Sequence, residues 1–359
     1  MVSIIPGIIT DEEALKDLRE MKSLVETYRG QVEDLVVQRR ELHDKGMYIG
    51  SGKIREISDL IKSRRIDVLV LCSIVKPGHI FEIKKILYKS NPRIKVWDRV
   101  DLILEIFSKH AHTAEAKLQI ELATMRHMGP KIYGMGHVLS RQAGGIGTLG
   151  VGETNTELMK RHWKNQMKIV QIKLQKLFSD RQRQLQRREK IGLRTVSIIG
   201  YTNAGKTSLF NKLTGKNNSV NNALFVTLDS SAGKITLPES KKQILLTDTI
   251  GFINNLPARL VEAFRSTLLE SVHADLLLHV IDASDPDTLQ KIHIVEQVLY
   301  ELNLRSKPRI MVFNKTDKMN GFQSSDLTKL YADFTPQFIS VRNTQGIESL
   351  LSTIETALQ

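Results

Sequence analysis

Gly200-Tyr201-Thr202-Asn203-Ala204-Gly205-Lys206-Thr207 is the stretch that decides how this 359-residue sequence folds. It matches the pattern G-x-x-x-x-G-K-[ST], follows the apolar run 195–199 and precedes a helical pattern over 208–213. Glycines at such a turn let backbone N–H groups point toward a phosphate, and the helix N-terminus adds partial positive charge. We therefore predict a strand, a phosphate-binding loop that extends to Ser208, and a helix.

Two further residue types complete a phosphate and metal site in this prediction. Lys206 is expected to reach the β- and γ-phosphates, and the Thr207 hydroxyl is expected to ligate Mg²⁺. Asp248-Thr249-Ile250-Gly251 follows the apolar run 243–247, 42 residues after Lys206. We predict that Asp248 holds Mg²⁺ through water and that the Gly251 N–H reaches the γ-phosphate.

The segment Asn314-Lys315-Thr316-Asp317 follows another apolar run, 309–313, and predicts which base is bound. The Asp317 carboxylate can accept hydrogen bonds from both N–H groups on the Watson–Crick edge of guanine. Adenine presents a different pattern there and would face the carboxylate with an acceptor. Asn314 is expected to brace the loop while the Lys315 stem packs along the base. The sequence therefore predicts GTP as substrate and GDP as product.

Two more segments are assigned to the same nucleotide. Thr227, preceded by Phe225 and Val226, lies 21 residues after Lys206, which suits a threonine that completes the Mg²⁺ shell when the γ-phosphate is present. Thr236 is the alternative candidate for this metal-binding threonine. Ser340-Val341-Arg342 takes the position of the last base-contacting loop. The predicted metal ligands are Thr207, Thr227 and Asp248, and the predicted catalytic residues are Lys206, Thr227 and Gly251.

The alternation of strand and helix patterns predicts an α/β fold in both halves of the chain. After residue 194, strands are expected at 195–199, 243–247, 276–281, 309–313 and 337–340, which indicates a doubly wound domain. Before residue 98, strands are expected at 2–9, 32–37, 68–75 and 94–97. Helices are expected at 11–28 and from near Lys53 and Gly78, as in a parallel-sheet domain.

Between these halves, apolar residues recur at steps of three and four along two long segments. One runs over 100–128, and the other starts after Thr154 with the stripe Met159, Trp163, Met167, Val170, Leu174 and Leu177. They predict a long antiparallel helical hairpin, joined by a loop at 134–152 that holds seven glycines. The predicted domains are thus 1–97 (α/β), 98–193 (hairpin) and 194–359 (nucleotide-binding).

The net charge of +13 is concentrated in one segment. Residues 160–194 contain 12 basic and only 2 acidic residues. A polyanionic partner, nucleic acid ahead of a membrane surface, is the natural interpretation, with Arg181, Arg183, Arg187 and Arg188 as phosphate contacts. The alternative is a solvated helix face.

Composition narrows the class of protein further. The only cysteine, Cys72, lies in an apolar run and is expected in a core, and a chain without a possible internal disulfide favours a reducing, cytoplasmic location. No apolar run is long enough to span a membrane. The histidines of the hairpin segment, among them His127, show no metal-ligand spacing and no accompanying acids, so a metal role is not expected.

The sequence resembles one known family, the HflX GTPases, over nearly its whole length. The resemblance lies in residues 48–53, 96–99 and 114–119, in the loop 144–148 followed by 152–154, and in the switch-like segments 224–229 and 248–252. It implies a monomeric protein that binds the large ribosomal subunit and its RNA, and that splits or rescues stalled ribosomes. The loop departs from the family pattern at Leu149 and Val151, where arginine and proline are usual.

Phe252 stands where Ras-like GTPases have the glutamine that orients water. Asn203 resembles the asparagine with which some GTPases lacking that glutamine ligate K⁺, so K⁺ is a further candidate cofactor. Two alternatives stay open at this point: a GTPase acting in ribosome assembly or RNA modification, and a nucleotide-gated RNA-binding module.

Overall fold

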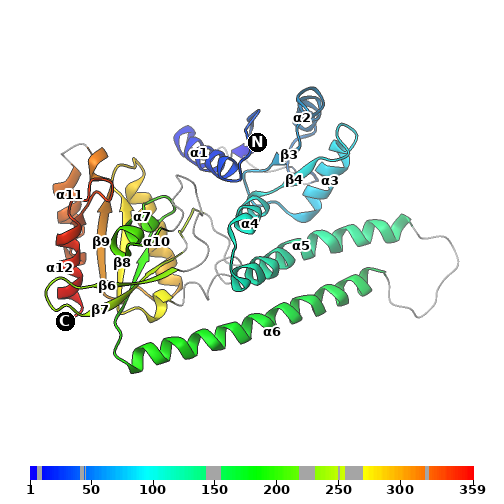
Figure 1. Cartoon of the computed structure of the whole chain (residues 1–359). Helices are drawn as coiled ribbons and strands as arrows, with labels where there is room; N and C mark the ends of the chain where they lie inside the picture. Colours follow the sequence, from blue (N-terminus) through cyan, green and yellow to red (C-terminus); the bar gives the residue numbers. More distant parts are fainter. Residues whose placement is uncertain are drawn as a thin grey trace. The chain divides into compact units, whose positions relative to one another are not determined.

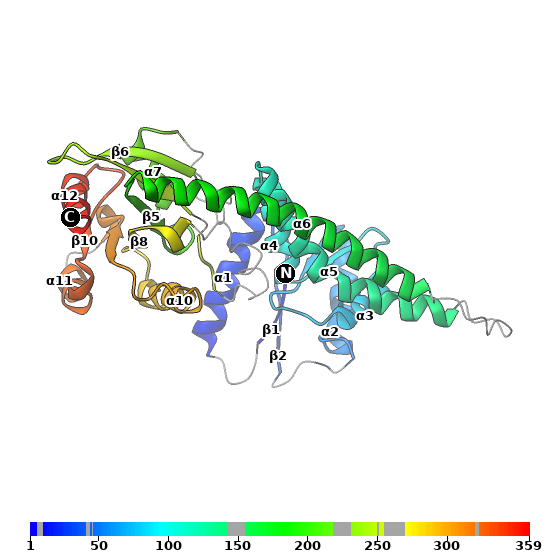
Figure 2. The ribbon, with the colours of Figure 1, turned by 90° about the horizontal axis from the view of Figure 1, so that it is seen from below.

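The structure is a computed structural model of the whole chain, drawn as ribbons in Figures 1 and 2. It describes residues 1–5, 10–40, 44, 46–142, 155–217, 231–249, 251–254, 270–319 and 323–359. For residues 11, 13, 130–142, 155, 156, 323 and 324 only the backbone is described.

Contacts between residues group the chain into two compact units. We call Met1–Lys109 with Lys117–Leu174 the N-terminal unit, and His110–Ala116 with Gln175–Gln359 the C-terminal unit. The helices α5 and α6, whose bounds are given below, each contribute residues to both units. The division into domains 1–97, 98–193 and 194–359 stays a prediction.

The N-terminal unit begins with short strands that alternate with helices, as the sequence predicts. Its elements are β1 (Val2–Ile5), α1 (Asp11–Thr27), β2 (Val36–Arg39), α2 (Ser51–Arg64), β3 (Val68–Val70), α3 (Pro77–Leu87) and β4 (Lys95–Trp97). β1 pairs with β2 and β3 pairs with β4, both in parallel. A parallel bridge between Val2 and Leu71 joins the two pairs, and the Cys72 N–H donates to the Val2 carbonyl. The predicted parallel α/β arrangement is confirmed.

Cys72 is buried, as predicted, and burial raises the pKa of its thiol to about 11. β3 ends before it, at Val70, so the strand predicted over 68–75 is too long. Residues 6–9 of the first predicted strand lie outside the described residues.

The long helix predicted over residues 100–128 is wrong, because the structure has two helices there. They are α4 (Arg99–His110) and α5 (Ala114–Gln142). Thr113 lies in the break, and its hydroxyl accepts a hydrogen bond of 3.1 Å from the Ala116 N–H, as an N-cap does. A capping threonine inside an otherwise continuous apolar stripe therefore starts a new helix.

α5 and α6 (Asn155–Lys190) form the predicted hairpin and lie side by side in Figures 1 and 2. The Trp163 indole N–H donates to the Met125 carbonyl oxygen at 2.9 Å, and Val170 is buried. Met159, which the predicted stripe included, is 42% exposed. α5 continues to Gln142, so the first part of the predicted loop 134–152 is helical, and residues 143–152 lie outside the described residues.

The C-terminal unit is built on a six-stranded sheet with the order β10-β9-β8-β5-β7-β6. Its strands are β5 (Thr195–Ile199), β6 (Ser231–Thr236), β7 (Gln243–Asp248), β8 (Leu276–Asp282), β9 (Arg309–Asn314) and β10 (Gln337–Phe338). Its helices after α6, within the described residues, are α7 (Lys206–Thr214), α10 (Thr288–Glu301), α11 (Gln323–Leu330) and α12 (Ile347–Ala357). The same residues include the 3₁₀ turns η1 (Thr316–Lys318) and η2 (Ala332–Phe334). All pairs are parallel except β6 with β7, and the antiparallel strand β6 is not among the strands predicted from the sequence.

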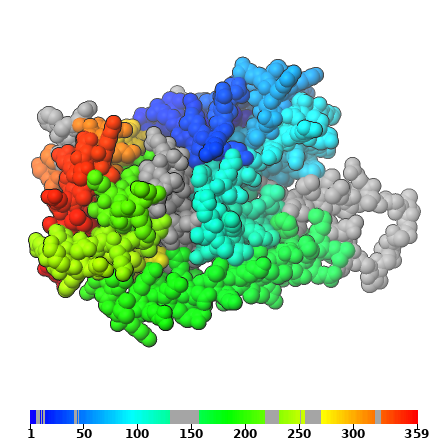
Figure 3. Space-filling model, viewed as in Figure 1, coloured from blue at the N-terminus to red at the C-terminus, as the bar shows by residue number. Residues whose placement is uncertain are grey.

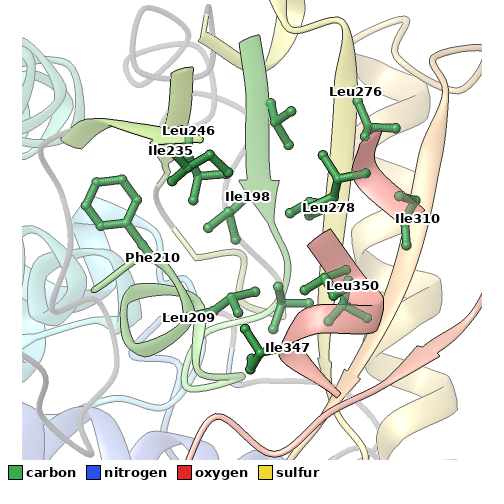
Figure 4. Close-up of a cluster of buried hydrophobic side chains, with 14 of the residues drawn as sticks. Ile198, Leu209, Phe210, Ile235, Leu246, Leu276, Leu278, Ile310, Ile347 and Leu350 are labelled. Carbon is green, nitrogen blue, oxygen red and sulfur yellow. The ribbon is translucent and has the colours of Figure 1, made fainter. Parts of the chain in front are cut away.

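Alternate strand residues face two apolar clusters, one on each side of this sheet. Figure 4 shows the larger cluster, in which Leu209 and Phe210 of α7 and Leu350 of α12 pack against Ile198 and Leu278 of the sheet. The smaller cluster packs α10 and α11 against the other side. The doubly wound arrangement predicted for this half is confirmed.

His279 is a titratable side chain inside β8. It is buried, its Nδ1 has no hydrogen-bond partner within the described part of the chain, and Glu296 Oε1 lies 3.9 Å from that nitrogen. Glu296 is occupied by Arg309, whose Nη1 donates to both carboxylate oxygens at 2.7 and 2.8 Å. Burial, with the positive charges of Arg309 and Lys206, lowers the pKa of His279 to about 3.

We expect this histidine to make the protein acid-labile. Between pH 6.5 and about 3 the unfolded chain binds a proton at His279 and the folded protein does not, so stability falls as the pH falls. His279→Phe should remove about 2–3 kcal/mol of the loss in unfolding free energy between pH 6.5 and 4.5. Urea unfolding at both pH values measures it, with the exposed His273→Phe as control. Equal pH dependence in wild type and His279→Phe would contradict the assignment.

No helix in the described residues has both the length and the apolar character that crossing a membrane requires.

Candidate functional site

The predicted phosphate-binding loop lies between β5 and α7, at the carboxyl end of the sheet's central parallel strands. Gly200 and Gly205 have φ angles of +147° and +95°. A Cβ at Gly200 would lie 2.2 Å from the Val280 carbonyl oxygen, and one at Gly205 would lie 2.2 Å from Asn314 Nδ2. Glycine is thus required at both positions by conformation and by space. Asn203, between them, is exposed and also has a positive φ, +63°.

Lys206 and Asp248 bring opposite charges together beneath this loop. The buried Lys206 ammonium donates to the Tyr201 carbonyl oxygen at 2.7 Å. Burial lowers the pKa of Lys206 to about 8, an effect that the nearby Asp248 charge opposes. Burial likewise raises the pKa of Asp248 to about 6, against the opposing influence of Lys206 and the Thr207 hydroxyl.

The residues present fit Mg²⁺. The Thr207 hydroxyl donates to Asp248 Oδ2 at 2.8 Å, so the two predicted ligands from distant parts of the sequence are adjacent. The other carboxylate oxygen, Asp248 Oδ1, is buried and has no hydrogen-bond partner among the residues that the structure describes. A buried carboxylate oxygen beside a hydroxyl is a donor set that Mg²⁺ prefers. Bound there, the ion would supply positive charge to the phosphate oxygens.

The segment after Asp248 returns to the phosphate-binding loop. The Phe252 N–H donates to the Gly200 carbonyl at 3.1 Å, and the Thr202 N–H donates to the Phe252 carbonyl at 2.8 Å. A Cβ at Gly251 would lie 2.8 Å from Lys206 Nζ, so this glycine sits directly against the lysine. Phe252 itself is buried, which agrees with a side chain that does not orient water.

The predicted base-reading loop contacts the phosphate-binding loop through its first two residues. Asn314 Nδ2 donates to the Ala204 carbonyl at 2.9 Å, and Lys315 Nζ donates to the Asn203 carbonyl at 2.9 Å. Lys315 also pairs with Asp282 Oδ2 at 2.6 Å and adopts a φ of +64°. These contacts fix the loop at the mouth of the site.

The third predicted segment, Ser340-Val341-Arg342, lies beside that loop. The Ser340 hydroxyl donates to Asp317 Oδ1 at 2.7 Å, and the Val341 N–H donates to Asn314 Oδ1 at 3.2 Å. The Ser340 hydroxyl, helped by the charges of Arg342 and Lys318, holds the pKa of Asp317 below its usual value despite opposing desolvation. Asp317 is therefore an exposed, ionised acceptor at this edge of the site.

Phe225, Val226, Thr227 and Ile250 lie outside the described residues. Thr236, the rival of Thr227, is described and is wrongly placed for a metal ligand. β6 runs antiparallel to β7 with Thr236 opposite Gln243 and Ser231 opposite Asp248. Five residues of strand put Thr236 roughly 16 Å along the sheet from Asp248.

Two of the arginines predicted to contact a polyanion instead form ion pairs within the C-terminal unit. Arg181 of α6 contacts Glu115 Oε2 at 3.0 Å and Glu270 Oε1 at 3.3 Å, and Arg188 contacts Glu270 Oε2 at 3.2 Å. Glu270 is only 4% exposed. We call these four residues the Glu270 network. The four-arginine prediction is thus wrong for Arg181 and Arg188. Arg183 and Arg187 are exposed and keep that prediction, although Arg183 also pairs with Asp180 on the same helix.

The expectation that no acids accompany the hairpin histidines is also wrong. His127 Nε2 lies 3.1 Å from Asp98 Oδ1 and 3.2 Å from Asp101 Oδ1. The two aspartates cap the start of α4 reciprocally, each accepting the other's N–H at 2.9–3.0 Å. The spacing Asp98-x-x-Asp101 was a signal for this cap, but nothing in the sequence indicated that α5 would bring His127 to it.

Comparison with known proteins places this geometry in a family. Three family models match the chain: "50S ribosome-binding GTPase" over residues 195–315, "GTP-binding GTPase Middle Region" over 110–188 and "GTP-binding GTPase N-terminal" over 15–108. The solved structure of SsGBP in complex with GDP has a TM-score of 0.56 and 25% identity, and covers 99% of this chain and 97% of its own.

Curated relatives carry one name. "GTPase HflX" of Caldanaerobacter subterraneus subspecies tengcongensis is 41% identical over 99% of this chain and 80% of the relative. "GTPase HflX" of Escherichia coli is 35% identical over 88% of this chain and 72% of the relative. With the residues predicted to contact the phosphates, the metal ion and the base brought together as described, the chain belongs to the HflX family of GTPases.

Proposed function

We propose that this GTPase binds the large ribosomal subunit through its RNA and uses GTP to split or rescue stalled ribosomes. GTP and Mg²⁺ would be held by the residues described above, with Lys206 and the Gly251 N–H at the γ-phosphate and Asp317 at guanine. Thr227 would complete the metal shell in the GTP state. We further expect a monomer in the cytoplasm.

The exposed basic face of α6 carries the ribosomal part of this proposal. The surface of α6 forms a continuous green band in Figure 3. Lys164, Lys168, Lys173 and Lys176 are all exposed, and the Glu270 network uses none of them. At about 100° per residue, these lysines are spread over the half of α6 opposite its apolar stripe, and positive charge spread in this way suits a phosphate backbone. The description of the family model over residues 195–315 as ribosome-binding supports the same partner.

Co-sedimentation tests the proposal. The full chain is mixed with large subunits, small subunits, intact ribosomes or ribosomal precursors, in the presence of GTP, a non-hydrolysable analogue or GDP. We expect nucleotide-dependent binding to the large subunit and splitting of intact ribosomes. Preference for precursors would favour a role in ribosome assembly instead. Binding that does not depend on the nucleotide would favour a passive RNA-binding module.

Replacing Lys164, Lys168, Lys173 and Lys176 with glutamine should weaken ribosome binding and flatten its salt dependence. Each lost phosphate contact lowers the slope of log affinity against log salt by roughly 0.7–0.9. GTP affinity should not change, because the nucleotide site lies in another part of the chain. The matched control replaces the exposed Lys62, Lys89, Lys242 and Lys329. If the slope of log affinity against log salt stays at the wild-type value, the lysines of α6 form only a solvated face.

We also propose that Asn203 helps to hold a K⁺ ion beside the β- and γ-phosphates. Its side chain is exposed in the middle of the loop, and Lys315 fixes its backbone oxygen. An added positive charge would offset charge that develops during hydrolysis.

Hydrolysis should then be faster in K⁺ than in Na⁺ at equal ionic strength, on the order of tenfold. Asn203→Ala should abolish this difference, and the exposed control Asn217→Ala should keep it. Steady-state phosphate release measures the rates. If wild type hydrolyses GTP equally fast in both salts, the ion site does not exist.

A further inference from the structure

The N-terminal unit contains a cavity that the GTPase activity does not use. Its volume is about 640 Å³, and it is lined by α3, β4, α4 and α5. Cavities of this size accommodate small molecules and cofactors. All of its lining residues belong to the N-terminal unit, so the cavity exists within one compact body.

The inner wall of this cavity is apolar. It is formed by Ile80, Phe81, Trp97, Leu104, Ile120 and Met128. The Trp97 ring is held in place because Tyr28 packs against it edge to face, with ring centroids 5.2 Å apart and planes at 87°. Tyr28 is in turn fixed by Lys109, whose ammonium lies 3.4 Å from the Tyr28 ring centroid and donates to the Tyr28 carbonyl. A preformed aromatic and aliphatic wall favours an apolar or aromatic ligand body.

Positive charge predominates where the cavity meets the surface. Lys84 and Lys85 of α3 and Lys95 of β4 line it and are exposed, and Lys95 Nζ lies 5.5 Å from the Trp97 ring centroid. Two acids also line it. The Asp101 carboxylate accepts the Asp98 N–H at 3.0 Å and lies 3.2 Å from His127, which leaves Glu105 as the acid that offsets the three lysines.

From the apolar wall and the three lysines we infer that this cavity binds a small amphipathic anion, a molecule with an aromatic or aliphatic body and a carboxylate, sulfonate or phosphate at one end. The body would fill the cavity against Trp97 and Met128, and the anionic end would lie among the lysines. This site is separate from the nucleotide site in the C-terminal unit.

A matched pair of fluorescent probes tests the inference on the full-length chain. 8-Anilinonaphthalene-1-sulfonate carries a charge, and N-phenyl-1-naphthylamine has the same aromatic body without it. The chain has two tryptophans, so Trp163→Phe leaves Trp97 as the sole donor for energy transfer to a bound probe. We expect saturable, one-site transfer from Trp97, with tighter binding of the sulfonate, and no displacement by saturating GTP.

Replacing Lys84, Lys85 and Lys95 together with glutamine should weaken binding of the sulfonate roughly 5- to 50-fold, while the uncharged probe changes by less than about twofold. Replacing the exposed Lys22, Lys62 and Lys89 is the control. Thr124→Phe, which fills the cavity from α5, should abolish binding of both probes with an unchanged circular dichroism spectrum. Displacement by octanoate or by phenyl phosphate then tells whether an acyl carboxylate or an aryl phosphate is the preferred anion.

Three results would overturn the inference. Equal affinity for the two probes, unaffected by the lysine replacements, would show a cavity without preference for anions. Sulfonate binding that survives Thr124→Phe would place the probe elsewhere, and displacement by GTP would place it in the nucleotide site. The lysine variants alter only exposed side chains, so they decide the matter even if Thr124→Phe fails to fold.

Discussion

Replacing Asp317 with asparagine is expected to lower the affinity for GTP by ~30- to 1,000-fold. The orientation of the new amide follows from the structure. The Ser340 hydroxyl accepts the Asn343 N–H at 3.2 Å and donates to Asp317 Oδ1, so it favours an oxygen at that position. The NH₂ group must then take the other position, where it faces a donor of guanine. Guanine loses a charge-assisted bond and meets a donor instead of an acceptor.

Xanthine carries a carbonyl oxygen where guanine carries its amino group, so Asp317→Asn should bind xanthosine triphosphate better than wild type does. Titrations with GTP, ATP and xanthosine triphosphate measure the change. Asp333→Asn is the matched control, because Asp333 is an exposed acid in η2 of the same unit. Asp285 serves less well, since it accepts the Asp287 N–H and pairs with Lys291. An unchanged preference for GTP in Asp317→Asn would remove residues 314–317 as the base-reading loop.

Gly200→Ala is expected to destabilise the C-terminal unit by about 3–5 kcal/mol and to prevent GTP binding. Two effects add. A non-glycine residue is strained at a φ of +147°, and the new Cβ would lie 2.2 Å from the Val280 carbonyl oxygen of β8. The neighbouring atom is backbone in a buried strand, so relief requires β5 and β8 to move apart beneath the phosphate-binding loop.

Gly215→Ala is the control for this prediction. Gly215 ends α7 with a φ of +69°, but a Cβ there meets no atom of the described residues within 4 Å. Gly215→Ala should lower the unfolding free energy by only about 1 kcal/mol, because only the conformational part of the effect applies there. Chemical denaturation followed by circular dichroism, with binding of a fluorescent GTP analogue, measures both variants. Similar losses in the two would show that crowding at Gly200 contributes little.

The sequence predicts the C-terminal sheet well because its motifs combine local chemistry with fixed positions after strands. Gly200, Asp248 and Asn314 each lie at the end of an apolar run, and parallel strands bring such ends to one edge. The antiparallel strand β6 carries no such motif. Its exposed residues Lys234 and Thr236 and its Gly233 give a weak strand pattern, so its place on the sheet edge could not be predicted.

The prediction of polyanion contacts from the charge of the segment is wrong for a different reason. It places Arg181 and Arg188 in one basic segment, yet their partners Glu115 and Glu270 are 66 to 89 positions away in the sequence. The same limit explains His127, whose acids lie 26 and 29 positions before it. Pairing across such distances is decided by how the helices pack, which no local pattern encodes.

The Glu270 network also limits which truncations, fusions and domain exchanges this GTPase can tolerate. A chain that began at residue 194 would contain every motif predicted to contact the nucleotide but neither of the arginines that pair with Glu270. That carboxylate is buried, and a buried charge left alone is strongly destabilising. The nucleotide-binding half is therefore not stable as a separate fragment unless the fragment includes the last turns of α6. A domain exchange that separates the nucleotide-binding half from the last turns of α6 should be tolerated only where residue 270 changes as well.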